Sequence, residues 1–318
     1  MQAPCLPFHP SSMPHYRSLD KLSLEGAWLT VGVFDGVHRG HQELLRQLVE
    51  GAHAAHSPAV VLTFDPHPAV LLGGKAEFKS LTTPEERFEL LETLGVDTVI
   101  TQTFDRALAD QTAEEFMQRA VRALGLQRLV VGYDTALGRG RQGDAKRLTE
   151  IGQELGFTVQ VIPALTESGE VISSTHIRRL IAAGEVAEAA ARLGREYSLK
   201  GPVIHGDGRG RHINIPTANI QPPDAKAIPA NGVYACWAWT HEEVHPAVTN
   251  IGIRPTFTPQ EFKSHVEAHL LGFDRELYDQ EVKLEFVERL RPEQKFPSIE
   301  ALIAQIHADI DRANEILV

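Results

Sequence analysis

The sequence has little cysteine, no long apolar run and no excess of basic residues. Only two cysteines, Cys5 and Cys236, occur among the 318 residues, which excludes a disulfide framework and makes a reducing cytoplasm the expected location. No apolar run approaches the roughly 20 residues of a membrane-spanning helix, so we expect no membrane partner. The formal net charge is −11, and both halves of the chain are acidic. A nucleic-acid partner is not expected, because phosphate backbones are bound through basic patches.

The length and the apolar content suffice for two domains. At roughly 100–200 residues per domain, 318 residues predict two. Hydrophobic residues make up 42% and charged residues 23%, which is typical of a folded globular protein. We expect a flexible leader over residues 1–18, a first domain over 19–190 and a second over 195–318.

The first domain alternates short apolar runs with amphipathic helical stretches. Its β-branched runs, at residues 28–34, 59–64, 96–101, 128–132 and 158–162, are typical of strands buried on both faces. Two expected helices begin at the capping boxes of residues 83–86 and 112–115, and they end at Gly95 and Gly125. This alternation predicts an α/β doubly wound parallel sheet, whose ligands bind beyond the carboxyl ends of the strands.

The second domain alternates apolar and polar residues. Segments 232–239, 265–271 and 281–290 predict antiparallel strands of a barrel or sandwich. A helix follows, whose apolar residues recur at helical spacing and are expected to pack against the domain. These residues are Ile299, Leu302, Ile303, Ile306, Ile310, Ala313 and Leu317.

Residues 32–41, GVFDGVHRGH, follow the first expected strand directly. Gly36 and Gly40 allow a tight turn and a close approach of the backbone to a ligand. His38 and His41 are three residues apart, so at the start of a helix both rings can face one object. A phosphate is favoured there. The alternatives are a plain turn with solvated histidines, or a zinc site that lacks a third ligand at short spacing.

A hydroxyl cluster lies near the end of the first domain. Ser174 and its neighbours predict a helix N-cap, and with Arg178 they form a possible second phosphate clamp. Residues 138–143 match G-x-G-x-x-G, but the first glycine does not end a strand as a dinucleotide turn requires. We interpret these residues as a cationic active-site loop.

The second domain has its own candidate residues. The glycines of segment 201–211 suggest a flap over a ligand. Thr217 and Asn219 offer neutral oxygens for Mg²⁺ beside phosphates, and Glu267, on an alternating strand, can take a proton from a hydroxyl nucleophile. Each of these features also has a purely structural interpretation.

Together these blocks resemble the prokaryotic bifunctional riboflavin kinase/FMN adenylyltransferases, also called FAD synthetases. The resemblance extends from about residue 28 to the C-terminus, and it includes residues 32–41, 64–68, 132–144, 172–178, 216–219, 231–234, 250–252 and 290–293. It implies a nucleotidyltransferase domain followed by a six-stranded β-barrel kinase domain with a C-terminal helix. The implied substrates and products are ATP, riboflavin, FMN and FAD, with Mg²⁺ as the metal.

The resemblance also assigns site residues. Glu267, His38 and His41 are the expected catalytic residues. ATP and its phosphates are expected in the first domain at Gly32, Phe34, Asp35, Gly36, His38, His41, Ser174, Thr175 and Arg178. FMN is expected there at Asp65, Pro66, His67 and Asp134. In the kinase domain, ATP and flavin are expected at Gly206, Gly208, Gly210, Arg211, Thr217, Asn219 and Arg291, with Thr217 and Asn219 as Mg²⁺ ligands.

Two other classes stay open at this point. A His-x-Gly-His turn also occurs in other nucleotidyltransferases and in class I aminoacyl-tRNA synthetases, but no Lys-Met-Ser-Lys-Ser-like loop is found. A regulator that binds flavin or nucleotide, with one half decayed, is the other alternative. The kinase half would be the half to decay, because Asn214 and Gly272 depart from the family pattern. Asn tolerates the left-handed region, so we expect Asn214 to keep a turn that Gly would otherwise make.

Overall fold

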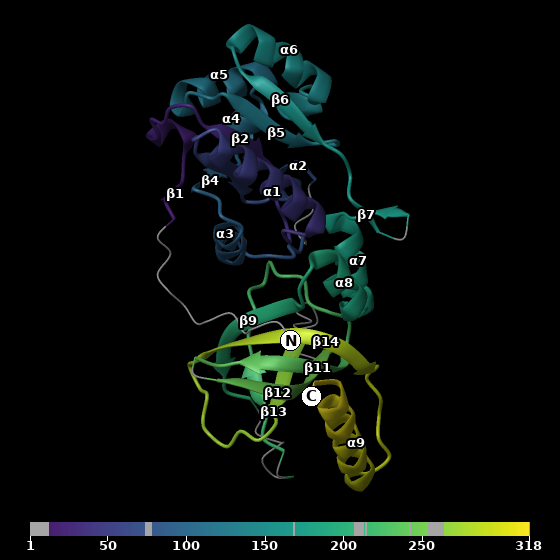
Figure 1. The fold of residues 1–318 in the computed structure, drawn as a ribbon. Helices are drawn as coiled ribbons and strands as arrows, with labels where there is room; N and C mark the ends of the chain where they lie inside the picture. Colours follow the sequence, from purple (N-terminus) through teal and green to yellow (C-terminus); the bar gives the residue numbers. More distant parts are fainter. Residues whose placement is uncertain are drawn as a thin grey trace. The chain divides into compact units, whose positions relative to one another are not determined.

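The computed structural model describes residues 13–73, 78–167, 169–206, 213, 215–241, 243–253 and 264–317. The chain divides into two compact units, with the division between Ser174 and Thr175. Figure 1 labels most of the helices and strands of both units, and each unit is described by itself.

The first unit is built on a six-stranded parallel sheet with the order β1-β4-β3-β2-β5-β6. From the central β2 the chain proceeds outward to β3 and β4, and it then returns to the other side of β2 to form β5 and β6. The carboxyl ends of β2 and β5 therefore flank the switch point where open α/β sheets bind ligands. The strands are β1 (His15–Tyr16), β2 (Trp28–Val31), β3 (Ala59–Asp65), β4 (Thr98–Thr103), β5 (Arg128–Gly132) and β6 (Thr158–Ile162).

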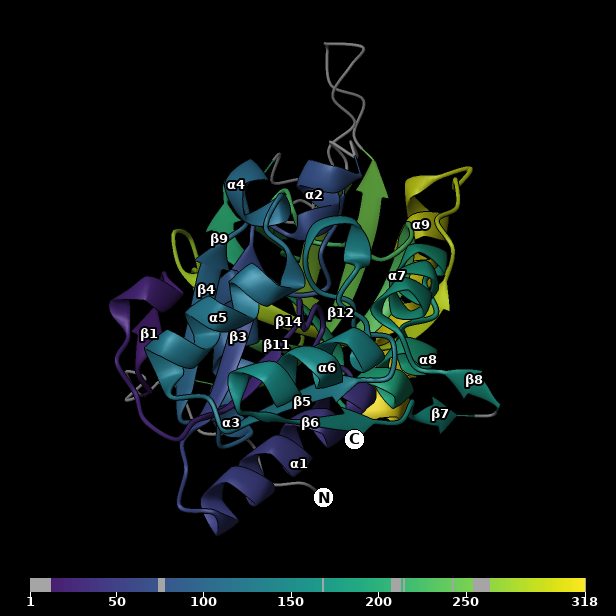
Figure 2. The same ribbon diagram turned by 90° about the horizontal axis from the view of Figure 1, so that it is seen from above.

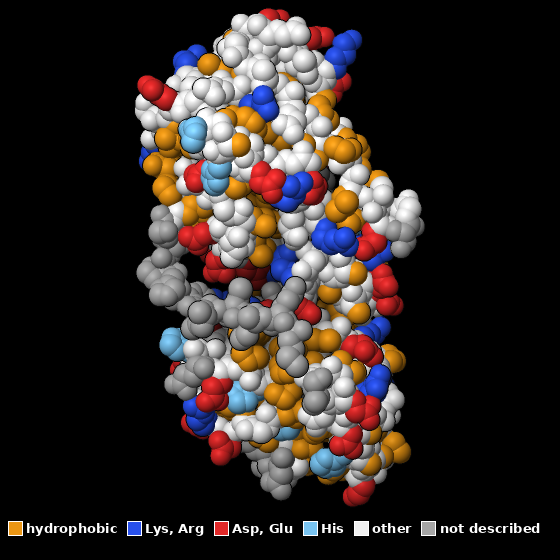
Figure 3. Space-filling view, viewed as in Figure 1, with side chains coloured by type: hydrophobic (Ala, Val, Ile, Leu, Met, Phe, Trp, Pro, Cys, Tyr) orange, Lys and Arg blue, Asp and Glu red, His pale blue; other side chains and the backbone are white. Residues whose placement is uncertain are grey.

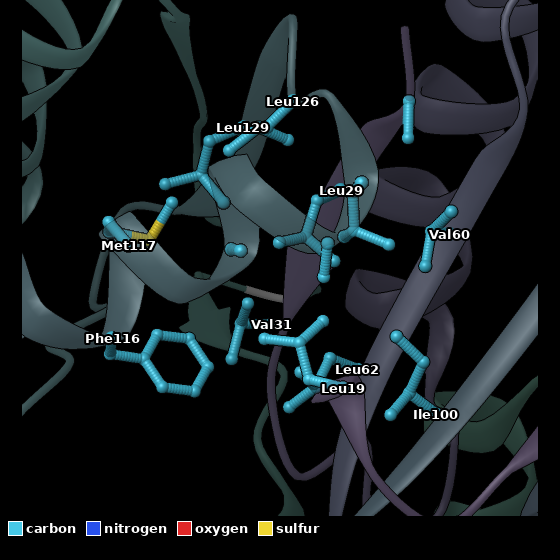
Figure 4. Close-up of a cluster of buried hydrophobic side chains, with 14 of the residues drawn as sticks. Leu19, Leu29, Val31, Val60, Leu62, Ile100, Phe116, Met117, Leu126 and Leu129 are labelled. Carbon is cyan, nitrogen blue, oxygen red and sulfur yellow. The ribbon is translucent and has the colours of Figure 1, made fainter. Parts of the chain in front are cut away.

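Helices cover both faces of this sheet, and each face has its own hydrophobic cluster. On one face, side chains of α5 (Ala113–Leu124) and α6 (Ala145–Leu155) pack on alternate residues of the central strands; Figure 4 shows this cluster, and Figure 2 shows the two helices together. On the other face, α1 (Arg39–Ala54) and α3 (Pro84–Thr93) pack on the intervening residues. The predicted doubly wound α/β sheet is confirmed.

Shorter elements complete the first unit. They are the 3₁₀ turns η1 (Leu19–Lys21) and η2 (Arg139–Arg141), the helices α2 (Pro68–Leu72) and α4 (Arg106–Ala109), and the hairpin of β7 (Thr166–Glu167) and β8 (Glu170–Val171).

The predicted capping boxes of α3 and α5 are both present. Thr83 and Glu86 exchange side-chain and backbone hydrogen bonds at the start of α3, and Thr112 and Glu115 do so at the start of α5. Gly125 ends α5 in the left-handed conformation, with φ 53°. These local signals act within one turn of helix, which is why they could be predicted from the sequence.

Part of the expected leader belongs to the sheet. His15 and Tyr16 form β1, which pairs with Val99 and Ile100 of β4. The ring of His15 stacks on Phe88 with centroids 4.5 Å apart. The expectation of a flexible leader is therefore corrected for residues 13–18, while residues 1–12 lie outside the described residues. A two-residue strand has no periodicity of its own, and only its pairing partner reveals it.

The second unit contains a closed antiparallel barrel with the order β10-β13-β12-β11-β14-β9. Side chains of alternate residues fill its interior, among them Tyr234 and Phe286, which are fully buried and meet edge to face. The barrel, and not the sandwich, is the correct alternative. The strands are β9 (Tyr197–Ile204), β10 (Ala218–Ile220), β11 (Gly232–Trp239), β12 (Val244–Ile253), β13 (Ser264–Leu270) and β14 (Glu281–Arg291).

Helices α7 (Ser174–Ala183) and α8 (Val186–Leu193) come before the barrel. From Thr175 onward they are grouped with the barrel unit, whereas the sequence-based boundary kept residues up to 190 with the sheet. Arg289 of β14 donates hydrogen bonds to Ala183 O and to Asn231 O, so a cation lies at the carboxyl end of α7, where the helix dipole favours it. The expected domain limits stay a prediction.

The C-terminal helix α9 (Ile299–Leu317) packs on the barrel through its last turns. Ala313 and Leu317 are buried against Val233, Ala235 and Val248. Ile299 is 63% exposed, so the predicted packing stripe is wrong at its first residue. Helical spacing shows which residues share a face, but it does not show how far the barrel extends beneath that face.

On the face that Figure 3 presents, acidic and basic side chains are interspersed over both units. Among the described residues, no helix has the length and apolarity that a membrane span needs.

Candidate active sites

The turn after β2 leaves the extended conformation earlier than predicted. The strand expected over residues 28–34 ends at Val31, because Phe34 and Val37 have φ of 52° and 40° and Gly36 has φ of 81°. A β-branched residue such as valine rarely adopts positive φ. Such backbone strain persists only where the surroundings hold it in place, and it is concentrated at functional sites.

Buried hydrogen bonds hold this turn. The carboxylate of Asp35 is buried, and its Oδ1 accepts hydrogen bonds from the backbone N–H groups of Leu81 at 2.8 Å and Thr82 at 3.1 Å. The N–H of Gly36 donates to Thr82 Oγ1 at 3.0 Å, and Ser174 Oγ donates to the carbonyl of Asp35 at 2.8 Å. Asp35, predicted to bind ATP, thus anchors the turn through its carboxylate.

His38 is the N-cap of α1. Its Nδ1 accepts a hydrogen bond from the backbone N–H of His41 at 3.3 Å, so in the neutral ring the proton is on Nε2. The two imidazoles stack, with centroids 3.7 Å apart and planes 16° apart. A Cβ at Gly40 would lie 3.2 Å from the ring of His38, which explains the glycine. The predicted juxtaposition of the two histidines is present.

His41 is held in its neutral form. Burial, followed by the positive charges of His38 and Arg87, lowers the pKa of His41 well below its ordinary value. Its Nδ1 is buried and has no hydrogen-bond partner among the described residues. A buried ring nitrogen without a partner costs free energy unless a ligand satisfies it. At neutral pH, His41 can therefore offer a ligand a hydrogen bond but not a formal charge.

The hydroxyl cluster of α7 meets the turn through Ser174. Within the same helix, Arg178 donates to Thr175 Oγ1 at 3.2 Å. The predicted roles of Thr175 and Arg178 toward phosphate stay predictions. Among the described residues, no cluster of three His, Cys, Asp or Glu side chains could hold a metal, so the zinc alternative has no support there.

Arg87, on α3, is a residue that the sequence analysis missed. Its guanidinium is buried and donates to the carbonyl oxygen of Val33 at 2.7 Å and to that of Phe64 at 3.4 Å. Burial lowers the pKa of Arg87, while the nearby carboxylates of Asp35 and Asp65 oppose that effect. An arginine on the buried face of an expected helix was the available signal.

The expected FMN residues follow the strands on either side of β2. Asp65, Pro66 and His67 come at the end of β3, where Nδ1 of His67 accepts from the N–H of Ala69 and the ring packs on Phe78. On the other side, Asp134 follows β5, and its backbone oxygen accepts from Arg141 at 3.2 Å. Their roles toward FMN are not tested.

The structure also agrees with rejecting the G-x-G-x-x-G match. Strand β5 ends at Gly132, well before Gly138, which has φ 74°. A Cβ at Gly138 would overlap the backbone of Ala113, so this glycine is needed for packing on the start of α5. Arg139 N–H donates to Gln111 O at 2.7 Å, which pins the loop further.

The barrel unit brings Asn219 and Glu267 together through strand register. Asn219 of β10 pairs with Glu267 of β13, and Glu267 pairs with Asn250 of β12. Side chains paired directly across strands lie on the same face of the sheet, with Cβ atoms about 4.5–5.5 Å apart. His265 lies two residues from Glu267 on the same face, and its Nε2 is hydrogen-bonded to Oε1 of Glu267 at 2.5 Å.

Asn219 is the buried member of this group. Its Oδ1 has no partner among the described residues, and a Cβ at Gly206 would overlap its amide group. Gly206 is therefore needed because the backbone closely approaches Asn219. The expected positions Gly208, Gly210, Arg211 and Asn214 lie outside the described residues, so the left-handed turn at Asn214 stays a prediction.

Arg291, expected to bind ATP or flavin, has a partner inside the protein. Its Nε and Nη2 form hydrogen bonds of 2.8–3.0 Å with the buried carboxylate of Asp309 on α9. Nearby, Asn231 donates to Glu293 at 3.1 Å, and a Cβ at Gly252 would overlap the same carboxylate. These contacts join three of the sequence blocks that carry the resemblance.

The first unit is a parallel sheet with a histidine pair at its switch point, and the second is a closed barrel with Asn219 and Glu267 paired across two strands. These two sites define a two-unit protein of the phosphate-transferring class. Residues 20–176 match the FAD synthetase family and residues 193–317 match the riboflavin kinase family. The chain belongs to the family of bifunctional riboflavin kinase/FMN adenylyltransferases.

Relatives of that description cover nearly the whole chain. One from Listeria monocytogenes is 36% identical over 95% of this chain and 94% of its own. One from Escherichia coli K12 is 37% identical over 94% of this chain and 95% of its own. A crystal structure described as a macrolide-efflux protein from Streptococcus pneumoniae has a TM-score of 0.88 at 29% identity, covering 95% of this chain and 98% of that one.

Proposed function

We propose that this chain makes FMN and FAD in two reactions at two sites. In the barrel unit, the γ-phosphoryl group of ATP is transferred to the ribityl hydroxyl of riboflavin, which gives FMN and ADP. In the sheet unit, a phosphate oxygen of FMN attacks the α-phosphorus of a second ATP, which gives FAD and pyrophosphate. The histidine pair at the start of α1 is the observation that carries the adenylylation assignment.

Adenylylation needs no covalent nucleophile on the enzyme. The FMN phosphate is already anionic, so the protein has to position the reactants and stabilise the charge that develops on the phosphates. His38 offers its Nε2–H group. His41 acts as a neutral hydrogen-bond donor, because burial lowers its pKa. The start of α1 adds the positive end of the helix dipole, and Ser174 and Arg178 are the proposed donors from α7.

Riboflavin phosphorylation begins from a neutral alcohol, so a base assists it. Glu267 is the proposed base and accepts the hydroxyl proton as the oxygen attacks the γ-phosphorus. His265, whose Nε2 shares a hydrogen bond with Oε1 of Glu267, is the proposed residue that orients the carboxylate.

Thr217 and Asn219 are the proposed Mg²⁺ ligands. The buried Oδ1 of Asn219, which has no partner among the described residues, suits a hard cation. When bound, Mg²⁺ would neutralise charge on the phosphates of ATP.

A product assay tests both reactions. The full chain is incubated with ATP, Mg²⁺ and either riboflavin or FMN, and the flavins are then separated. We expect FMN followed by FAD from riboflavin, and FAD from FMN. Accumulation of FMN alone would contradict the proposed sheet reaction, and failure to convert riboflavin while FMN is adenylylated would contradict the proposed barrel reaction.

A further inference from the structure

The hydrogen-bond ladder between β2 and β3 ends just before the two binding segments of the sheet unit. Its last backbone bond joins Gly32 N–H to Leu62 O at 3.0 Å. Beyond that point the segments that continue from β2 and β3 are no longer joined by backbone hydrogen bonds. The first enters the strained turn of residues 34–37, and the second continues through residues 65–67. Side chains then connect the two segments in place of the ladder. Thr63 Oγ1 donates to Val33 O at 3.0 Å, and Arg87 donates to carbonyl groups of both segments.

Arg87 bridges the two strand ends with one side chain. Its Nη1 donates to Val33 O at 2.7 Å and its Nη2 to Phe64 O at 3.4 Å, and only 5% of the residue is exposed. A planar guanidinium presents donors in a rigid fork, which an ammonium group does not. The buried Nε has no partner among the described residues. The hydrogen bonds of the guanidinium therefore compensate only part of the free-energy cost of burying its charge.

The same short segment of chain holds the turn from another side. Leu81 and Thr82, just before α3, donate their N–H groups to Asp35 Oδ1, and Thr82 Oγ1 accepts from Gly36 N–H. Residues 81–87 therefore form hydrogen bonds with three of the four residues that follow Gly32, namely Val33, Asp35 and Gly36. A strained turn with this many buried restraints is rigid, and rigidity near phosphate-binding groups sets the reaction geometry.

We propose that Arg87 is a positioning residue for FMN adenylylation, which sets the spacing between the ATP-binding turn of residues 34–38 and the FMN-binding segment of residues 65–67. The inference rests on the proposed function of this unit. Arg87 acts through the carbonyl groups of Val33 and Phe64 and is not assigned any contact with substrate.

The effect of Arg87 on turnover follows from geometry. The attacking phosphate oxygen of FMN and the α-phosphorus of ATP are bound by segments that continue from different strands. A displacement of about 1 Å between reacting groups can cost about 10²-fold in rate. Loss of the bridge should therefore lower kcat for FAD formation by about 10–100-fold, with a smaller change in KM for ATP, because each binding segment itself remains.

A second consequence concerns pH. Arg87 faces Asp35, Asp65 and Glu85, and its charge acts on His41 together with that of His38. Removing the positive charge of Arg87 raises the pKa of His41, so His41 becomes protonated at a higher pH. The acid limb of the pH profile for FAD formation should move to higher pH in R87M and should stay in place in R87K, which keeps the charge.

The experiment compares R87M, R87K and R87Q with R46M in the full chain. Arg46 is an exposed arginine of α1 that pairs with Glu43 and Glu50, so R46M controls for loss of a charge in the same unit. For each variant, FAD formation from FMN is measured against ATP concentration and pH. Phosphorylation of riboflavin by the other unit provides an internal reference, and circular dichroism monitors folding at the assay temperature.

We expect R87M to lose about 10–100-fold in kcat for FAD formation while R46M and riboflavin phosphorylation are unchanged, with partial recovery in R87K. Unchanged kcat and an unmoved acid limb in folded R87M would overturn the proposal, as would losses that only follow the unfolded fraction. If R87M does not fold, R87K and R87Q decide, because only the glutamine should shift the acid limb. FAD formation that survives removal of both His38 and His41 would instead contradict the proposed function.

Discussion

The two candidate sites are constructed in opposite ways. In the sheet unit, the turn of residues 34–37 departs from ordinary backbone conformations. Segment 81–87 holds Asp35 and the neighbouring Val33, and Ser174 bonds the carbonyl of Asp35. In the barrel unit, Asn219 and Glu267 lie on regular strands and face one another through register.

The difference indicates where each site is vulnerable. A site on a strained turn depends on distant residues that supply its restraints, because the turn is not stable alone. A site on paired strands is held by the many backbone hydrogen bonds between the strands of the barrel. Replacing a single side chain there should therefore change the chemistry of the site more than its geometry. The predictions below separate the two cases.

The largest expected effect is loss of FAD formation in a double variant, H38A with H41A. Each removed donor to developing phosphate charge costs about 10²–10³-fold, so we expect a loss of about 10⁴-fold or more. Riboflavin phosphorylation should be nearly unchanged, because the two sites belong to separate compact units. Both rates are read from the separated flavins, and an equal fall in both rates in a folded variant would contradict the separation.

The next largest effect is expected for E267Q, which tests the proposed role of Glu267 as the base in the barrel unit. The amide keeps the shape of the side chain but cannot accept the riboflavin proton, and loss of a general base typically costs about 10²–10⁴-fold. FMN formation should fall by that amount, while FAD formation from supplied FMN is unchanged. Near wild-type turnover at saturating riboflavin would leave Glu267 with a structural role only.

A stability effect of intermediate size is expected at α9. Asp309 is 5% exposed and pairs with Arg291, and removing one partner of a buried ion pair costs about 3–5 kcal/mol. D309A should lower the free energy of unfolding of the barrel unit accordingly, as measured by urea unfolding. R312A, at an exposed arginine of the same helix, should change it by less than about 1 kcal/mol. Equal effects would mean that the buried pair does not secure α9.

The smallest effect is the pH dependence of stability that His41 contributes. Its folded-state pKa is lowered, so above the ordinary histidine value both the folded and the unfolded protein have a neutral ring. As the pH falls below about 6.5, the unfolded chain takes up a proton that the folded protein does not, and the free energy of unfolding decreases. H41Q should reduce this decrease between pH 7.5 and 5.5 in urea unfolding; an identical decrease would show that His41 is not the source.

Much of the fold could be predicted from local patterns. Capping boxes act within four residues, and buried parallel strands appear as short β-branched runs, so α3, α5 and most strands were placed correctly. Strand β1 could not be predicted, because its two residues are extended only through pairing with β4. The exposed Ile299 was misassigned for a similar reason, since burial depends on what lies opposite.

For the sites, the sequence by itself determined which chemistry-bearing residues follow which strand, since chain order alone places His38 and His41 at a helix start and Glu267 on an alternating strand. Only the tertiary structure decided how those residues are held. Asp35 became an anchor for Leu81 and Thr82, and Arg87 became the bridge between β2 and β3. Both depend on contacts between segments 20 or more residues apart, and such contacts form only when packing brings the segments together.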